Sequence, residues 1–255
     1  YFYGAFEKPL LFFLRDVLET VSEESPKPIF MDIGANVGQH SLYLSKFARI
    51  VLAFEPYPKV SMQFKKLIEI NQISNIKIFE YGLSDEAESL NYYAPTGSNE
   101  GIGSFDENTQ IKGNKCYGKL ELQRGDAVVE KGSWIGIKLI KIDVEGFEKN
   151  VIKGLINTIT QERPVIVCEV TYGQKLSFTS IENLLKHLPP RYEIMTFSTR
   201  KPDGRKNKRK GSMARRTGYY ELDNLKSWRE DGQDNLVLIP SEKSEGIPRK
   251  SPKNP

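Results

Sequence analysis

The sequence predicts a single α/β domain over residues 1–240, built on a mostly parallel seven-stranded sheet with helices on both faces. Apolar, strand-like runs alternate with helical patterns along the chain, which is typical of parallel sheets. A glycine-rich turn joins the first run to the next helical pattern, and polar residues follow most of the runs. Together these features favour a ligand-binding α/β fold.

The lead-in, residues 1–27, predicts an amphipathic helix over 6–24, because Leu10, Leu14 and Val17 recur at helical spacing. The runs that predict the seven strands are 29–33, 50–55, 76–81, 137–144, 164–170, 192–197 and 236–239. Helical patterns cover 38–47, 58–72, 147–157 and 178–188.

Two further strand-like runs, 87–94 and 119–123, flank a long loop over 96–118. Long loops of this kind are usually functional. Gly101 and Gly103 leave room for a substrate, and Phe105 is placed to cover the site. The last two predicted strands form an antiparallel pair around a basic insert, residues 198–220, and the polar tail 241–255 is expected to be disordered.

Composition excludes some classes of protein. No run of 18 or more apolar residues occurs, so no transmembrane segment is predicted. Two cysteines, Cys116 and Cys168, are too few for a disulfide framework, and a reducing, cytoplasmic setting is expected. The oligomeric state is not encoded in any pattern that we recognise.

The stretch Ile-Phe-Met-Asp-Ile-Gly-Ala-Asn-Val-Gly, residues 29–38, is the most informative part of the chain. A strand that ends at Gly34 and feeds a helix at Gly38 lets the backbone approach a ligand closely. Glu55 ends the next run about twenty residues later, where nucleotide-binding units place the carboxylate that binds a ribose. The middle position is Asn36, and the nearby Asp32 carboxylate repels a pyrophosphate. A nicotinamide dinucleotide is therefore disfavoured, and a ligand with positive charge fits better.

Acidic or polar residues follow each core strand, and the carboxyl ends of parallel strands meet in one crevice. Carboxylates crowded there are costly unless they bind something. The residues concerned are Asp32, Glu55, Ser84, Asp85, Asp143, Glu145 and Glu169.

A second segment, Leu-Ile-Lys-Ile-Asp-Val-Glu-Gly-Phe-Glu at 139–148, adds a specific resemblance. With Asp-Ile-Gly-Ala-Asn-Val-Gly and with Phe-Glu-Pro at 54–56, it resembles the FkbM family of S-adenosylmethionine-dependent methyltransferases over residues 29–170. The resemblance implies a Rossmann-like class I methyltransferase fold. It also implies O-methylation of a hydroxyl, most often on a carbohydrate, glycolipid or secondary metabolite.

Carried over by position, the resemblance assigns the methionine and ribose parts of the cofactor to the glycine turn, the ribose hydroxyls to Glu55, and the adenine to Ser84 with Asp85. Asp143 would lie near the cofactor amine. The full implied set is Asp32, Gly34, Ala35, Asn36, Gly38, Ser41, Glu55, Pro56, Ser84, Asp85 and Asp143.

Methyl transfer to an alcohol is helped by a general base. The candidates are Asp143, Glu145, Glu169 and His40, and the last of these follows the glycine turn directly. Three of them, Asp143, Glu145 and Glu169, could bind a divalent cation through oxygen. No spacing in the sequence requires one, and we predict no metal.

Between Arg200 and Arg216 lie nine basic residues and one acid, Asp203. Such a run attracts an anionic partner, for which we expect a small-molecule or glycan acceptor. Aromatic residues do not interleave with the charges, so nucleic acid is less favoured. The alternatives are an RNA methyltransferase that uses residues 200–216, or a catalytically silent module that binds S-adenosylmethionine.

Overall fold

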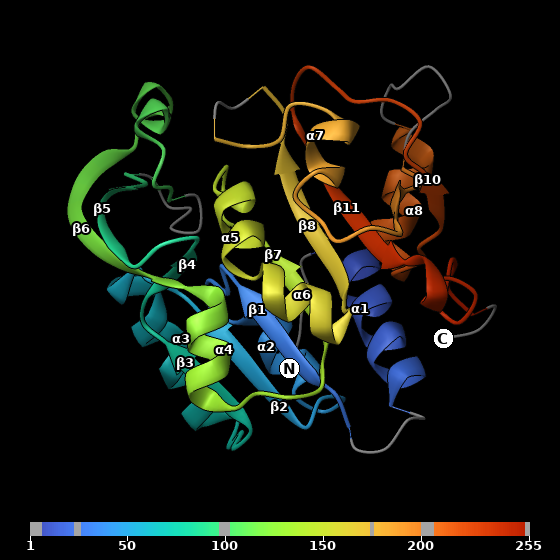
Figure 1. Cartoon of the computed structure of the whole chain (residues 1–255), viewed down its shortest axis with the longest axis horizontal. Helices are drawn as coiled ribbons and strands as arrows, with labels where there is room; N and C mark the ends of the chain where they lie inside the picture. Colours follow the sequence, from blue (N-terminus) through green and yellow to red (C-terminus); the bar gives the residue numbers. More distant parts are fainter. Residues whose placement is uncertain (1–6, 23–26, 97–102, 174–175, 200–206, 253–255) are drawn as a thin grey trace.

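The structure, a computed structural model, describes residues 7–22, 27–96, 103–173, 176–199 and 207–252. Its main sheet has eight strands in the order β10-β9-β11-β8-β7-β1-β2-β3 (Figure 1). These strands are β1 (Ile29–Ile33), β2 (Ile50–Phe54), β3 (Ile76–Phe79), β7 (Ile137–Ile142), β8 (Val165–Thr171), β9 (Tyr192–Phe197), β10 (Leu222–Asn224) and β11 (Gln233–Pro240).

The five strands from β8 to β3 are parallel, and β11 runs antiparallel between β8 and β9. The predicted α/β fold and the predicted antiparallel pair are confirmed. The one addition is the short strand β10, which pairs antiparallel with β9 at the edge.

Helices cover both faces of this sheet because alternate strand residues point to opposite sides. On β1, Phe30 belongs to one buried core and Met31 to the other. The first core is closed by α1 (Lys8–Val21), α2 (Gln39–Leu44) and α3 (Pro58–Ile70). The second is closed by α5 (Glu148–Gly154), α6 (Ile156–Glu162) and α7 (Ile181–Leu185).

The predicted helix 147–157 is two helices, α5 and α6, that break at Leu155. The break follows Gly154, where a Cβ atom would lie 1.9 Å from the carbonyl oxygen of Ser84. This close approach attaches α5 to a second, smaller sheet.

That small sheet has the order β4-β6-β5, from β4 (Gly82–Ser84), β5 (Glu88–Ala94) and β6 (Lys115–Arg124). The two strand-like runs that flank the long loop are therefore strands, but they form a sheet of their own beside the main one (Figure 1). Helix α4 (Gly125–Gly132) returns the chain from β6 to the main sheet, and the loop contains a short 3-10 helix at Glu107–Lys112.

The basic insert contains a helix, α8 (Lys208–Thr217), which packs on α1. Asn207 caps its start by accepting a hydrogen bond from the Lys210 amide, 3.2 Å, and Gly218 ends it in the left-handed conformation. Residues 200–206, which include Lys206, lie outside the described residues, as do residue 6 and Gly101.

The predicted disordered tail is wrong for residues 241–252. Ile247 is 4% exposed and belongs to the first core, and the Leu222 amide donates to the Arg249 carbonyl at 2.7 Å. The average polarity of the tail hid one apolar residue and the backbone hydrogen bonds that hold it against β10. In the part of the chain that the structure describes, no helix is both long and apolar enough to cross a bilayer.

We expect Ile247→Ala to lower the free energy of unfolding by roughly 2–5 kcal/mol, because it removes buried methyl groups and leaves a cavity. Ile135→Ala is the matched control, since that side chain is 74% exposed, and should change stability by no more than about 0.5 kcal/mol. Urea unfolding of both variants measures the difference. Equal, small effects would show that the tail does not pack on the core.

Candidate functional site

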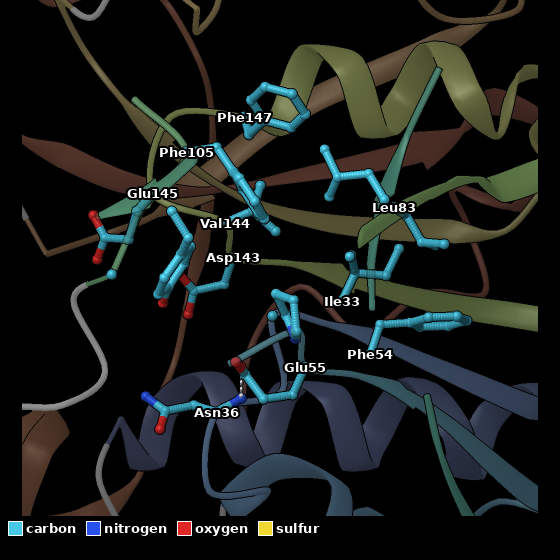
Figure 2. Close-up of a pocket in the computed structure, with 16 residues that line it drawn as sticks. Ile33, Asn36, Phe54, Glu55, Leu83, Phe105, Asp143, Val144, Glu145 and Phe147 are labelled. Carbon is cyan, nitrogen blue, oxygen red and sulfur yellow. Dashed lines mark hydrogen bonds between the residues drawn. The ribbon is translucent and has the colours of Figure 1, made fainter. Parts of the chain in front are cut away.

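A cavity lies between the carboxyl ends of the main-sheet strands and the small sheet. In Figure 2 the polar side chains Asn36, Asp143 and Glu145 lie on one side, and the apolar side chains Phe54, Leu83 and Ile33 lie on the other. The cavity is lined by Ile33, Gly34, Asn36, Phe54, Glu55, Pro56, Gly82, Leu83, Tyr92, Gly103, Phe105, Leu122, Asp143, Val144, Glu145 and Phe147.

The predicted glycine turn forms one edge of this cavity. Gly34 has a φ of 77°, and a Cβ atom there would lie 1.8 Å from the Asp143 carbonyl oxygen. Gly38 has a φ of 81°, and its Cβ atom would lie 1.9 Å from the ring of Phe64. Both positions require glycine, because neither the backbone conformation nor the space admits a side chain.

Glu55 ends β2 and joins two parts of the cavity wall. Its Oε2 accepts the Asn36 amide and its Oε1 accepts the Tyr57 amide, each at 2.9 Å. Burial raises the pKa of Glu55 to about 7, and the two backbone hydrogen bonds only partly oppose this. Each carboxylate oxygen keeps a second acceptor position that a ligand hydroxyl can use.

Asp32 and Ser41 lie behind the cavity and do not line it. The Ser41 hydroxyl donates to Asp32 Oδ2 at 2.6 Å, and Lys141 Nζ lies 3.8 Å from Asp32 Oδ1. Asp32 is fully buried, and its hydrogen bond with Ser41 holds the start of α2 against β1. Lys141 was not predicted as a site residue, although a lysine inside an apolar run, two residues before Asp143, is a signal that could have found it.

Asp143 and Glu169 interact closely enough for their titrations to be linked. Burial raises the pKa of Asp143, but the nearby charge of Lys141 and a hydrogen bond from Glu169 outweigh it, so the pKa of Asp143 falls below its usual range. Burial, followed by the charge of Asp143, raises the pKa of Glu169. These directions favour the ionised form of Asp143 and the protonated form of Glu169.

Glu145 completes an acidic group with this pair: one carboxylate oxygen from each of Asp143, Glu145 and Glu169 lies within 4.8 Å of the others. Gln233 Nε2 donates to Glu145 Oε2 at 3.1 Å. Such a group suits a positively charged ligand, and the expectation that no metal binds here stays a prediction.

The turn that carries these acids is held by Glu148, the last residue of the Asp-Val-Glu-Gly-Phe-Glu motif. Its Oε1 accepts the Gly146 amide at 2.7 Å, and its Oε2 accepts the Ser177 hydroxyl at 3.1 Å. Burial raises the pKa of Glu148 to about 7, despite these bonds. The second glutamate of the motif is thus a structural residue that sequence reasoning did not single out.

His40 lies in the first turn of α2 and is 8% exposed. Its Nε2 atom has no hydrogen-bond partner among the described residues. Burial, and then the charge of Lys141, lowers the pKa of His40 to about 3. The imidazole is therefore neutral and a weak base, and it does not line the cavity.

Ser84 is the last residue of β4, and Asp85, which follows it, contacts helix α5. The Ser84 hydroxyl donates to Glu88 Oε1 at 3.0 Å, and Asn150 Nδ2 donates to Asp85 Oδ1 at 3.0 Å. Neither residue lines the cavity, whereas the preceding Gly82 and Leu83 do. The assignment of the adenine to Ser84 and Asp85 stays a prediction.

Aromatic side chains from the small sheet, the long loop and the start of α5 also line the cavity. Tyr92 and Phe105 have ring centroids 5.2 Å apart, and Phe105 and Phe147 have centroids 5.7 Å apart. Phe105 does line the site, as the sequence predicted. Tyr92 and Phe147 were missed, because aromatic residues in strands and helix starts are more often part of an ordinary core.

The arrangement combines an apolar end, a carboxylate that can receive hydroxyls, and an acidic end. It suits an elongated ligand with a flat apolar part, a diol and a cationic group.

Comparison with known proteins agrees with this geometry. Residues 32–192 match the methyltransferase FkbM domain. The hexuronic acid methyltransferase AglP of Haloferax volcanii is 30% identical over 159 residues, which cover 60% of this chain and 61% of that protein. Methyltransferase 1 of Beauveria bassiana is 29% identical over 142 residues, which cover 49% of this chain and 57% of that protein.

The 2-O-methyltransferase NoeI of Sinorhizobium fredii is 24% identical, with 71% of this chain and 79% of that protein covered. The matched region thus spans about three fifths of the first two relatives. Among solved structures, methyltransferase FkbM from Methylobacillus flagellatus aligns with 15% identity and a TM-score of 0.48, over 88% of this chain and 47% of that chain.

We expect Gly38→Ala to lower the free energy of unfolding by about 1–3 kcal/mol, because the residue must keep a positive φ and its methyl group meets Phe64. Gly211→Ala is the control: it lies inside α8 with no heavy atom within 4 Å, so it should stabilise by about 0.5–1 kcal/mol. Opposite signs in denaturant unfolding are the expected result. A neutral Gly38→Ala would contradict the described turn.

Proposed function

This chain belongs to the FkbM methyltransferase family, and from that premise we propose that it transfers a methyl group from S-adenosylmethionine to a hydroxyl of a carbohydrate-type acceptor. The observation that carries the proposal is the cavity itself. It brings the Gly34 turn, the Glu55 carboxylate and the acidic end at Asp143 to one place.

Two features of the residues present fit this cofactor. Gly34 lines the cavity, and its lack of a side chain lets the Asp143 carbonyl approach the turn closely, so that Asp143 reaches the same cavity. Glu55 retains acceptor capacity beyond its two backbone hydrogen bonds. An adenosine group would lie toward Ile33, Phe54 and Leu83, with its ribose hydroxyls on Glu55.

The polar end would receive the amino acid part of the cofactor. Asn36 and Asp143 face the cavity there, and the ionised Asp143 favours a cationic group. When bound, S-adenosylmethionine supplies an activated methyl group on a sulfonium centre. The protein's main task is then to orient the acceptor oxygen and to take up its proton.

Glu145 and Asp143 are the cavity-lining carboxylates of the predicted catalytic set, and either could accept the proton of the hydroxyl. Glu169 supports Asp143 from behind, and His40 is too weak a base and too deeply buried for this role. Tyr92, Phe105 and Phe147 would exclude water from the same end, which strengthens every charge interaction there.

The names of two relatives, a hexuronic acid methyltransferase and a 2-O-methyltransferase, support a sugar hydroxyl as the acceptor. A basic helix, α8, could attract an anionic acceptor, and it keeps RNA as a second candidate. Its five cations, Lys208, Arg209, Lys210, Arg215 and Arg216, are all exposed.

We expect S-adenosylmethionine to bind and NAD to bind poorly, and Glu55→Ala to weaken cofactor binding by about 1.5–3 kcal/mol, the range for charge-assisted hydrogen bonds. Hydroxyls donate to the ionised carboxylate, so affinity should rise with pH as Glu55 loses its proton at a pKa of about 7, and level off above it. Calorimetric titration between pH 6 and 8 measures both effects. Glu86→Ala, at an exposed position, is the control, and tight NAD binding without a response to S-adenosylmethionine would sink the proposal.

We expect joint replacement of Lys208, Arg209 and Lys210 by glutamine to leave cofactor affinity unchanged. With labelled cofactor, the Michaelis constant should rise for a uronic-acid glycan and stay constant for a neutral one, and salt should reduce the difference. Methylation of RNA instead of either glycan would establish the second candidate. Loss of cofactor binding would mean that α8 belongs to the cofactor site, against the assignment made here.

A further inference from the structure

Lys141 is a buried lysine in the middle of β7. It is 2% exposed, and it pairs in register with Asp32 of the neighbouring strand β1. Its Nζ atom lies 3.0 Å from Asp143 Oδ2 and 3.8 Å from Asp32 Oδ1. A buried ammonium is costly unless it is paired, so these two carboxylates determine where it can lie.

Several carboxyl groups surround the single ammonium group of Lys141. The titratable groups that interact with Lys141 are Glu7 before α1, Asp32 on β1, His40 on α2, Asp143 after β7, and Cys168 and Glu169 on β8. Asn235 on β11 adds an amide that donates to Glu7 Oε1 at 3.5 Å. His40 is neutral, so four carboxyl groups share one ammonium.

Lys141 and the Asp143 carboxylate that it contacts differ in their exposure to solvent. The Lys141 side chain is 3% exposed, whereas the Asp143 side chain is 28% exposed and lines the cavity. A ligand in the cavity therefore meets Asp143 and cannot reach the ammonium behind it. Any effect of Lys141 on binding or transfer must act through Asp143.

We propose that Lys141 is a positioning residue that keeps the Asp143 carboxylate ionised and fixes its orientation at the polar end of the cavity. The ammonium binds Oδ2, and the Asp143 side chain still lines the cavity. The excess proton of the acidic group then stays on Glu169. The proposal concerns the charge at this point, and only its consequence for methyl transfer rests on the proposed function.

That consequence is a division of roles between two carboxylates. A carboxylate held by an ammonium is a poor proton acceptor, because taking up a proton would break the ion pair. Asp143 would supply fixed negative charge and orientation, and Glu145, the other carboxylate of the acidic group that lines the cavity, would take the hydroxyl proton.

The test uses the full chain without cofactor. The side-chain carbon of Asp143 is followed by nuclear magnetic resonance between pH 4 and 9 in the parent chain, in Lys141→Arg and in Lys141→Met. We expect Asp143 to be ionised throughout in the parent and in Lys141→Arg. In Lys141→Met it should titrate at least ~1 pH unit higher, the scale of shift that one nearby charge produces.

Loss of the lysine can destabilise the fold by leaving Asp32 unpaired, so the double variant Lys141→Met with Asp32→Asn is included to remove the second charge. The same upward shift is expected there. Lys138→Met is the control on the same strand, because its partner Glu162, at 3.3 Å, lies outside the site. It should leave the Asp143 titration unchanged.

A second measurement follows cofactor affinity by calorimetry. In Lys141→Met the dissociation constant should rise relative to the parent as the pH falls through the range in which the Asp143 carboxyl of that variant takes up a proton, toward a limit of about tenfold for a one-unit shift, and should recover toward the parent value at pH 9. Lys141→Arg should stay near the parent. An Asp143 carboxylate that titrates identically in all the folded variants would overturn the proposal, even if S-adenosylmethionine binds as expected. Failure of cofactor binding in every variant, with the Asp143 shift intact, would count against the proposed function alone.

Discussion

The cavity depends on one close contact, between Gly34 and the backbone carbonyl of Asp143. Strand β1 lies between β2 and β7, and the three strands end level with one another. The Asp143 amide donates to the Ile33 carbonyl at 2.9 Å, and the Gly34 amide donates to the Phe54 carbonyl at 3.0 Å. These backbone bonds fix the relative positions of Asn36, Glu55 and Asp143, so the site is as rigid as the sheet that carries it.

The same convergence creates an electrostatic problem that the chain solves locally. Carboxyl groups from several strand ends cannot all be ionised in a partly buried crevice. Glu55 is supported by two backbone amides, Asp143 by an ammonium, and Glu169 by a retained proton. Each of these interactions acts on a different carboxyl group. Acids only a few ångströms apart can therefore carry different charges.

Much of this could be predicted from the sequence, and the failures have physical causes. The alternation of runs predicted the main sheet, and the spacing of Gly34 and Glu55 picked out two residues that line the cavity, because both patterns are encoded locally. Lys141 was hidden because its partner Asp32 becomes adjacent only through strand register. The tail was misread because one buried isoleucine decides its packing while composition averages over many residues. Ser84 and Asp85 do not line the cavity, because turn geometry, not residue type, decides which residue at the end of a strand faces inward.

The small sheet β4-β6-β5 has a consequence for how such an enzyme diversifies. It contributes Leu83, Tyr92 and Leu122 to the cavity, yet it forms no ladder with the main sheet. The segment between β5 and β6 can therefore change in length or sequence without altering the register of the main-sheet strands that end at Glu55 and Asp143. Under the proposed function, mutations that recruit new acceptors need not alter the main-sheet residues assigned to the cofactor, so substrate range could evolve under weak constraint while the donor chemistry is inherited intact.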